Sequence, residues 1–528
     1  MKTTKPINLQ RTILLGLAAM LLLGPGSAAA HEERPVQFPS GLGSVPVYRT
    51  GGPTLVVCRS DSLARAANYP NALRQLNQRL FVECRRRGFS HIQDAINAVV
   101  QPGTRILILP GVYKEAPSLA PPTAYCAAIA SHFPLSFEEQ RACPHNHNLI
   151  AIFGDGPDAD TACDGPLCNL QIEGTGREPG DVVIDGRFTK MNVIRADRAD
   201  GVYFRNFTVQ NSTFNSLYVI ETDGFVIDQV VGRWNDEYAF LTFASDHGLY
   251  TDCEAYGNGD SGIYPGSAAD LHGLRAAVEI RRCRSHHNLI GLSGTAGNSL
   301  LVHDSDFFDN SVGISLDSAF PNHPGMPQNS STFINNRIGS NNEDYYRFYR
   351  DGTCFKPSAE RGYEQGVVCP ALGVPIGTGI LFAGGNLNSV RQNWIWDNWR
   401  FGIMLFWMPA FVRGEVDPDK QFDTSHFNQY RDNRMGISPR GREQPNGIDV
   451  WWDEEGKGNC WEGNQSHGGA ITSDPANLPA CDPPAPFSPG NQDKQSSLFA
   501  CLAWSPENLD PPGCPFTQKP PRPPHHGR

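Results

Sequence analysis

The chain contains 528 residues, of which 39% are hydrophobic and 19% are charged, and its formal net charge is −11. This excess of negative charge argues against a nucleic acid as partner, because a phosphate backbone is bound through basic residues. It also gives no general attraction for an acidic glycan, which would need a local basic strip.

The N-terminus is typical of a secretory signal peptide. Lys2, Lys5 and Arg11 precede an apolar run over 12–23, and small residues before His31 offer a cleavage site. A membrane anchor is the alternative, but the apolar run ends short of the roughly 18 residues that a span needs. We therefore predict that residues 1–30 are removed and that the product is secreted, with no membrane span.

Residues 31–88 are expected to form an N-terminal cap that contains one strand at 54–57. Ser90 can begin a short helix, in which apolar residues recur on one face over 92–100. A strand-like run over 105–113 follows. A helix placed at the end of a sheet would protect the exposed edge from pairing.

Four aspartates crowd into one short segment: Asp155, Asp158, Asp160 and Asp164. Carboxylate-rich loops suit Ca²⁺, but the spacing departs from that of an EF-hand. A turn closed by the neighbouring cysteines, Cys163 and Cys168, is the alternative. Calcium is the one cofactor that the sequence suggests, and the sequence requires none.

A repeat dominates the middle of the chain. Seven asparagines each follow an apolar strand in one register: Asn211, Asn235, Asn258, Asn288, Asn310, Asn341 and Asn398. The first five are spaced 24, 23, 30 and 22 residues apart. An apolar column precedes them at a fixed distance, with Tyr203, Ile227, Tyr250, Ile280 and Val302. Repeats of this length are typical of a solenoid.

The repeat predicts a coil of parallel strands in which each turn pairs with the turns above and below. Asparagine tolerates a left-handed corner, and stacked copies can hydrogen-bond along the column. A β-sandwich is the alternative, since its strands also have turn signals at short spacing. Sandwich strands, however, have no reason to repeat asparagine in one register.

Several segments resemble the pectin-lyase-like superfamily. Residues 89–113 are similar to the start of its right-handed parallel β-helix, and 169–176, 182–186 and 201–207 are similar to its early coils. The resemblance implies an all-β fold, a right-handed parallel β-helix over 89–455 behind a short capping helix. It assigns no activity, because this fold carries lyases, hydrolases, epimerases, esterases and non-enzymes.

The known activity motifs of that superfamily are absent. The chain lacks the Asp-Pro-His-Asp box of alginate C5-epimerases, which makes an epimerase less favoured. It also lacks the Asn-Thr-Asp, Gly-His-Gly and Arg-Ile-Lys set of polygalacturonases. No residue role can therefore be carried over by motif.

Polar residues beside the asparagine column form the candidate catalytic strip: Asp236, Glu237, Asp260, His287 and Asp309. They come from four consecutive predicted turns, so they could lie near one another. Carboxylates with a histidine between them could supply a general base and a general acid. The alternative is a solvated corner, because aspartate, asparagine and histidine are common in turns.

Arg282 lies in a neighbouring outward column, between Asp252 and Asp304. It could neutralise the carboxylate of a uronate substrate. The alternative is a surface ion-pair ladder of small energetic value.

Aromatic residues are the candidates for substrate binding. A loop insertion at 342–375 carries Tyr345 and Tyr346, and the late coils carry Trp396 and Trp399. Rings with a polar group suit a sugar-binding surface. Packing inside the last coils explains the tryptophans equally well.

All 14 cysteines follow the signal segment, and their even number suits disulfides formed in an oxidising compartment. The expected pairs are Cys163 with Cys168, Cys253 with Cys283, and Cys354 with Cys369. Zinc would need clustered spacing, which is absent. Residues 456–528 form a Cys/Pro-rich extension, stapled at first and disordered over its last dozen residues.

These observations predict an exported, monomeric β-helix protein that binds a polysaccharide along an outer groove. A polysaccharide lyase or a glycoside hydrolase is the enzyme class expected. The alternative is a non-catalytic extracellular or periplasmic β-helix that serves in binding, at a surface or in maturation.

Overall fold

The computed structural model describes residues 34–132, 134–154, 163–321, 323–413, 415, 425–467 and 469–524. The predicted signal peptide lies outside these ranges, as do Asp155, Asp158 and Asp160 of the proposed calcium loop. Within the described residues, no helix is both long and apolar enough to span a membrane.

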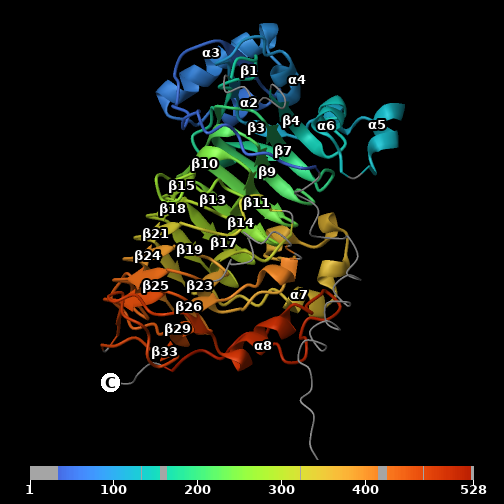
Figure 1. The fold of residues 1–528 in the computed structure, drawn as a ribbon. Coiled ribbons are helices and arrows are strands. Elements are labelled where there is room, and N and C mark those ends of the chain that lie inside the picture. The colour runs from blue at the N-terminus through green and yellow to red at the C-terminus, as the bar shows by residue number, and fades with distance from the viewer. Residues whose placement is uncertain are drawn as a thin grey trace, which may run out of the picture.

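The molecule is a right-handed parallel β-helix, as the sequence predicted (Figure 1). A 21-stranded sheet, sheet A, receives two strands from most turns, and an 11-stranded sheet, sheet B, receives one. A typical turn consists of β12 (Asp246–Thr251), β13 (Glu254–Asn258) and β14 (Ser261–Gly266). The next turn places β15 (Val278–Arg281), β16 (Arg284–His286) and β17 (Ile290–Thr295) beside them, in parallel.

The remaining strands of sheet A are β1 (Thr54–Val57), β2 (Arg105–Ile108), β3 (Gly111–Tyr113), β5 (Gln171–Gly174), β6 (Val182–Asp185), β8 (Val202–Gln210), β10 (Asp223–Asn235), β18 (Leu300–His303), β19 (Asp306–Phe308), β21 (Thr332–Ile334), β22 (Arg337–Gly339), β24 (Ser389–Arg391), β25 (Trp394–Trp396), β27 (Gln429–Arg431), β28 (Arg434–Met435), β31 (Cys460–Glu462) and β32 (Gln465–Ser466). Those of sheet B are β4 (Asn148–Phe153), β7 (Asn192–Asp197), β9 (Asn215–Ile220), β11 (Tyr238–Phe243), β20 (Val312–Asp317), β23 (Thr378–Ala383), β26 (Phe401–Phe406), β29 (Ile448–Trp452) and β33 (Ser473–Asp474). A short antiparallel pair joins β30 (Glu455–Gly456) to β34 (Ser488–Pro489).

The helices are α2 (Ser62–Arg65), α3 (Asn71–Arg87), α4 (Ile92–Asn97), α5 (Ala124–Ile129), α6 (Phe137–Ala142), α7 (Arg347–Arg350) and α8 (Gln492–Cys501). In Figure 1, α2 to α4 cover the N-terminal end of the coil and α8 lies near its other end. The carboxylate of Glu115 accepts the backbone N–H groups of Ile92 and Gln93, both at 3.0 Å. It therefore caps α4, the role that the sequence gave to Ser90.

The core is a continuous apolar column inside the coil. Its sheet A members pair from turn to turn and are fully buried: Phe204, Ile227, Tyr250, Ile280, Val302, Phe333 and Val390. The prediction was wrong only at its first member, since Phe204 and not Tyr203 occupies the column. Tyr203 is turned away and donates its hydroxyl to Asp228 at 2.8 Å.

A ladder of buried asparagines runs along one corner of the coil. Side-chain amide to carbonyl hydrogen bonds of 2.6–3.2 Å join Asn235, Asn258, Asn288, Asn310, Asn341, Asn398 and Asn446 in that order. The predicted column is thus confirmed from Asn235 to Asn398. Each internal amide is satisfied by the next turn, so the ladder stabilises the stacking that no single turn could achieve.

Two details of this corner differ from the prediction. Ser212, not Asn211, stands opposite Asn235 and donates its hydroxyl to it at 2.8 Å. The true turn is therefore one residue shorter than the spacing between the first two asparagines suggested. The left-handed residue is also not the asparagine but its predecessor, as at His287 with φ 54° and Asp309 with φ 54°.

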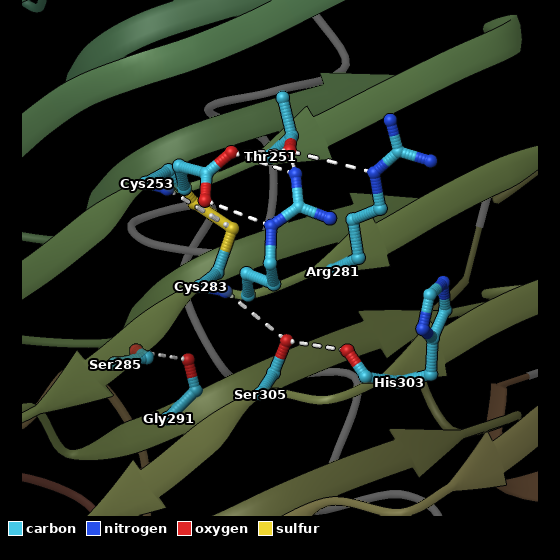
Figure 2. The surroundings of a disulfide bond; sticks show 10 residues. Thr251, Cys253, Arg281, Cys283, Ser285, Gly291, His303 and Ser305 are labelled. Carbon is cyan, nitrogen blue, oxygen red and sulfur yellow. Dashed lines mark hydrogen bonds and ion pairs between the residues drawn. A yellow bond between two sulfur atoms is a disulfide. The ribbon is translucent and has the colours of Figure 1, made fainter.

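Seven disulfides pair all 14 cysteines, each of which lies in the described residues, and the three expected pairs are among them. Figure 2 shows the Cys253–Cys283 disulfide, which joins two adjacent turns. Directly below it, the backbone N–H of Cys283 donates to the hydroxyl of Ser305 at 3.2 Å (Figure 2). A full set of disulfides is typical of proteins that fold in an oxidising compartment.

The C-terminal extension is more closely joined to the coil than the sequence suggested. The coil continues beyond residue 455, through β31 and β32 to β33. Near the chain end, Phe516 packs against Phe401, and Lys519 lies 4.8 Å from the ring centre of Trp399. Lys519, one of the last dozen residues, thus contacts the coil.

Candidate active site

The predicted catalytic strip divides into two groups. His287 and Asp309 immediately precede ladder asparagines, at the end of sheet A, where His287 is exposed and its Nδ1 lies 2.8 Å from Nδ1 of His286. Asp236, Glu237 and Asp260 lie after ladder asparagines, toward sheet B. Among the residues that the structure describes, no hydrogen bond or ion pair joins Asp260 to His287.

Asp236 anchors the loop insertion. Its carboxylate accepts hydrogen bonds from Ser358 and Tyr363 and forms an ion pair with Arg361 at 3.0 Å. Burial raises the pKa of Asp236 despite this ion pair. With all of its partners in the loop, Asp236 acts as a structural contact.

Arg282 forms a surface ion pair. Its guanidinium donates to both carboxylate oxygens of Asp252, at 2.9 and 2.8 Å, and to Thr251 at 2.8 Å. Its side chain is 51% exposed, so the pair contributes little to stability. This is the alternative that the sequence left open.

The proposed substrate-binding aromatics have different environments. Tyr345 and Tyr346 are buried, and the Tyr346 hydroxyl donates to the carbonyl of Leu372 at 2.9 Å. Both rings pack inside the protein, as the rings of Tyr238 and Tyr264 also do. Trp399 donates its indole N–H to Asp397 at 2.9 Å beneath the C-terminal tail, whereas Trp396 lines a pocket on sheet A.

A cluster of acid–base groups lies on the outer side of sheet B, across β11, β14, β17 and β20. Tyr238 donates its hydroxyl to Asp260 at 3.0 Å. The rings of Tyr238 and Tyr264 are 4.7 Å apart, on neighbouring strands. The hydroxyl of Tyr264 lies 3.1 Å from Nε2 of His323, which comes from the loop after β20.

The hydrogen bonds define the proton positions in this cluster. Nδ1 of His323 lies 3.0 Å from the carbonyl of Pro321, which can only accept, so Nδ1 carries the proton. When the imidazole is neutral, Nε2 accepts from the hydroxyl of Tyr264, whose oxygen in turn accepts the backbone N–H of Thr295 at 3.3 Å. Burial and the charge of Asp317 raise the pKa of Tyr264 well above its ordinary value, although the N–H of Thr295 lowers it, so any transfer from Tyr264 needs His323 to take the phenol proton.

Three carboxyl groups near Tyr238 and Tyr264 have raised pKa values. Burial raises the pKa of Asp260 to about 7. Burial, together with the charges of Asp260 and Asp236, raises the pKa of Glu237 well above its usual range. Burial also raises the pKa of Asp317, which accepts the hydroxyl of Thr295 at 2.9 Å. Clusters of perturbed groups are typical of functional sites.

Glu237 has a distinctive environment. Its side chain is half-buried, and its carboxyl group makes no hydrogen bond or ion pair with the residues that the structure describes. The upward shift of its pKa favours the neutral form of this carboxyl group. Glu237 is thus a proton donor without a protein acceptor.

The sequence did not indicate Tyr264, His323 or Asp317. Tyr264 occupies an outward position of a six-residue strand, and that alternation was the one signal available. His323 lies 59 residues away in a loop, with no motif around it. Among the described residues, no group of three or more His, Cys, Asp or Glu side chains could hold a metal ion.

Comparisons with known proteins agree with this architecture. Residues 185–323 match a family model described as a right handed beta helix region. No curated protein matches the sequence. The strand order and this family-model match define the fold as a right-handed parallel β-helix.

Solved structures resemble the chain at low identity and low TM-score. The A-module of Azotobacter vinelandii mannuronan C-5 epimerase AlgE4 has 12% identity and a TM-score of 0.41, over 74% of this chain and 93% of that chain. The AlgE6 A-module of the same organism has 14% identity and a TM-score of 0.39, over 72% and 91%. Pectate lyase Pel9A has 13% identity and a TM-score of 0.33, over 84% of each chain. No residue role is transferred from them.

Proposed function

We propose that this protein is an exported enzyme that binds a polysaccharide across the outer side of sheet B and cleaves it by acid–base catalysis. The observation that carries the proposal is the Tyr264–His323 hydrogen bond beside Asp260 and Glu237, whose pKa values are raised. An acid and a base at one place are what glycan cleavage requires. The carbohydrate class rests on analogy of fold.

In a β-elimination, a base removes the proton next to the uronate carboxyl group, the bond to the leaving oxygen breaks, and an acid protonates that oxygen. Tyr264 takes the substrate proton as it passes its own to Nε2 of His323. Neutral Glu237 supplies the proton to the leaving oxygen. Hydrolysis would instead need one carboxyl group as acid and one carboxylate to activate water.

The test is a glycan screen with matched variants. Pectate, alginate, hyaluronan and neutral glycans are incubated with the protein, and both reducing ends and unsaturated-uronate absorbance are measured. We expect Tyr264→Phe to reduce the rate at least 100-fold, because the hydroxyl is lost while the ring remains. Tyr256→Phe is the control, since the Tyr256 hydroxyl accepts from Arg233 on sheet A.

The screen also separates the alternatives. Unsaturated products identify a lyase, and reducing ends without that absorbance identify a hydrolase. His287→Ala should leave the rate within about twofold, because His287 lies away from the cluster. If no glycan is cleaved although one binds, the protein is a non-catalytic binder; if Tyr264→Phe keeps the full rate, the catalytic centre lies elsewhere.

A further inference from the structure

A pocket lies on the outer side of sheet A, away from the acid–base cluster on sheet B. It has a volume of about 410 Å³. Strands β19, β22 and β25 contribute Phe308, Arg337 and Trp396 to its lining, and the loop after β28 contributes Arg440 and Arg442.

The loop after β28 forms a hairpin. Its two arms meet at Ile437 and Glu443, and the backbone N–H of Ser438 donates to the carbonyl of Arg442 at 2.9 Å. A hydrogen bond of 2.9 Å from the N–H of Asp397 to the carbonyl of Gln444 attaches the hairpin to the coil. The two arginines are thus carried by a structured element beside sheet A.

The aromatic lining belongs to a stacked column. Tyr256, His286 and Phe308 point outward from successive turns, with ring centres 5.3 and 4.8 Å apart. The next position is Gly339, and Trp396 follows it. A Cβ atom on Gly339 would lie 2.3 Å from the ring of Trp396, so only glycine lets that ring take its place. Aromatic rings at this pocket provide an apolar surface for a sugar ring.

The charges of the pocket are uneven. Arg337 is paired with Asp306, with Nη2 and Oδ2 2.8 Å apart. The guanidinium groups of Arg440 and Arg442 make no ion pair or hydrogen bond within the described residues. Two unpaired guanidinium groups in a protein of formal charge −11 form a local basic site. Guanidinium groups bind carboxylate and sulfate in fixed geometry.

We propose that this pocket binds an acidic sugar residue of a polysaccharide, with the sugar ring against Trp396 and Phe308 and the anionic group on Arg440 and Arg442. The anionic group is a carboxylate or a sulfate. The ligand proposed for this pocket is a polysaccharide, as is the substrate proposed above, and the two proposals have nothing else in common. The pocket needs no catalysis, and it would hold a chain at a distance from the centre on sheet B.

The test measures binding by isothermal titration calorimetry. Oligogalacturonate and oligoalginate represent the carboxylate arm, heparin-derived oligosaccharides represent the sulfate arm, and a neutral glucan oligosaccharide is the third arm. We expect at least one acidic arm to bind, with an affinity that falls as salt is added. The double variant Arg440→Ala/Arg442→Ala should weaken binding at least 10-fold, and Trp396→Ala should do the same.

Arg391→Ala is the matched control, because Arg391 is exposed on β24 of the same sheet and does not line the pocket. It should change the affinity less than twofold. Circular dichroism checks that each variant is folded. If the double variant binds as the wild type does, or if the neutral glucan binds equally well, the proposal is wrong.

Tyr264→Phe separates this proposal from the proposed function. That variant should keep the arginine-dependent binding although it loses turnover. Arginine-dependent binding without any turnover in the wild type would support the pocket and contradict the enzyme. If the wild type turns a glycan over but the double variant at Arg440 and Arg442 binds it as well as the wild type does, the enzyme is supported and the pocket is contradicted.

Discussion

Cys253 and Cys283 lie in adjacent turns with Cα atoms 4.6 Å apart, at neighbouring positions of a column that Ser305, Asn336 and Asn393 continue. Between these two turns a covalent bond takes the place of the hydrogen bond that joins Asn336 to Asn393 at 3.0 Å. One column thus stabilises the stack by two kinds of link.

Replacing both Cys253 and Cys283 by serine should lower the free energy of unfolding by about 2–4 kcal/mol, because a cross-link over a separation of 30 residues restricts the unfolded chain. Guanidinium unfolding followed by circular dichroism measures this. The matched control is the serine pair at Cys163 and Cys168, whose separation is 5. This control should lower the free energy of unfolding by about 1.5 kcal/mol less than the Cys253/Cys283 replacement does. Equal losses would contradict the loop-length argument.

Asn288→Ala should lower the free energy of unfolding by about 1–3 kcal/mol for each buried group left without a partner. The change removes the acceptor of Asn258 at 2.6 Å and the donor to Asn310 at 3.2 Å. Thermal unfolding measures the loss. Gln429→Ala, a change at an exposed position of β27, is the control and should stay within about 0.5 kcal/mol. A neutral Asn288→Ala would mean that the ladder does not stabilise the stack.

Burial raises the pKa of Asp260 to about 7 in the folded protein, from an ordinary value of 3.8, and this makes stability depend on pH. Between about pH 4 and pH 7 the folded state holds more protons than the unfolded state, so the free energy of unfolding falls as pH rises, and the loss persists above pH 7. Asp260→Asn removes this term. Relative to wild type, the variant should therefore melt higher at pH 8 than it does at pH 5.

The control for that experiment is Asp252, whose pKa is shifted in the direction opposite to that of Asp260. Hydrogen bonds from Arg282 lower the pKa of exposed Asp252, so its small contribution is present above the unfolded pKa and is lost as pH falls. Asp252→Asn should therefore change the melting temperature little at either pH. The same wild-type-to-Asp260→Asn difference at pH 5 and pH 8 would show that Asp260 is not the titrating group.

Asp236→Ala should loosen the loop insertion, because its carboxylate binds Ser358, Arg361 and Tyr363 together. Limited digestion with trypsin, followed by reduction and mass spectrometry, should show faster cleavage after Arg361. Glu364→Ala, an exposed change in the same loop, serves as control. Cleavage at the wild-type rate would mean that other contacts hold the loop.

Much of the fold could be predicted because a solenoid repeats its pattern. The asparagine ladder and the apolar column both require one residue type at one position of every turn, so the sequence displays them directly. The errors of register occurred at the first turn, where Asn211 and Tyr203 fit the pattern by type and miss the true pairing by one residue. The sequence of a single turn carries no signal for the register in which its strands pair with those of the next turn.

The candidate site could not be predicted in the same way. Tyr264 lies on a strand, and its partner His323 lies in a loop whose path no periodicity encodes. His287 and Asp260 fit one strip in the sequence, yet they lie on opposite sides of the ladder corner. The loops bring the acid–base groups together. Because loop length differs from turn to turn, the repeat does not predict which groups meet.

The ladder also determines how such a coil can change. Because each turn ends at the same asparagine and is joined to the next by the same pair of atoms, a whole turn is an exchangeable unit. Duplication or deletion of one turn would leave every asparagine of the ladder with a partner and would change only the length of the coil. Functional side chains, in contrast, are added where a loop extends out of the regular turn. The hairpin beside Trp396 and the loop that carries His323 are two such loops. Length and activity can therefore evolve separately in this architecture.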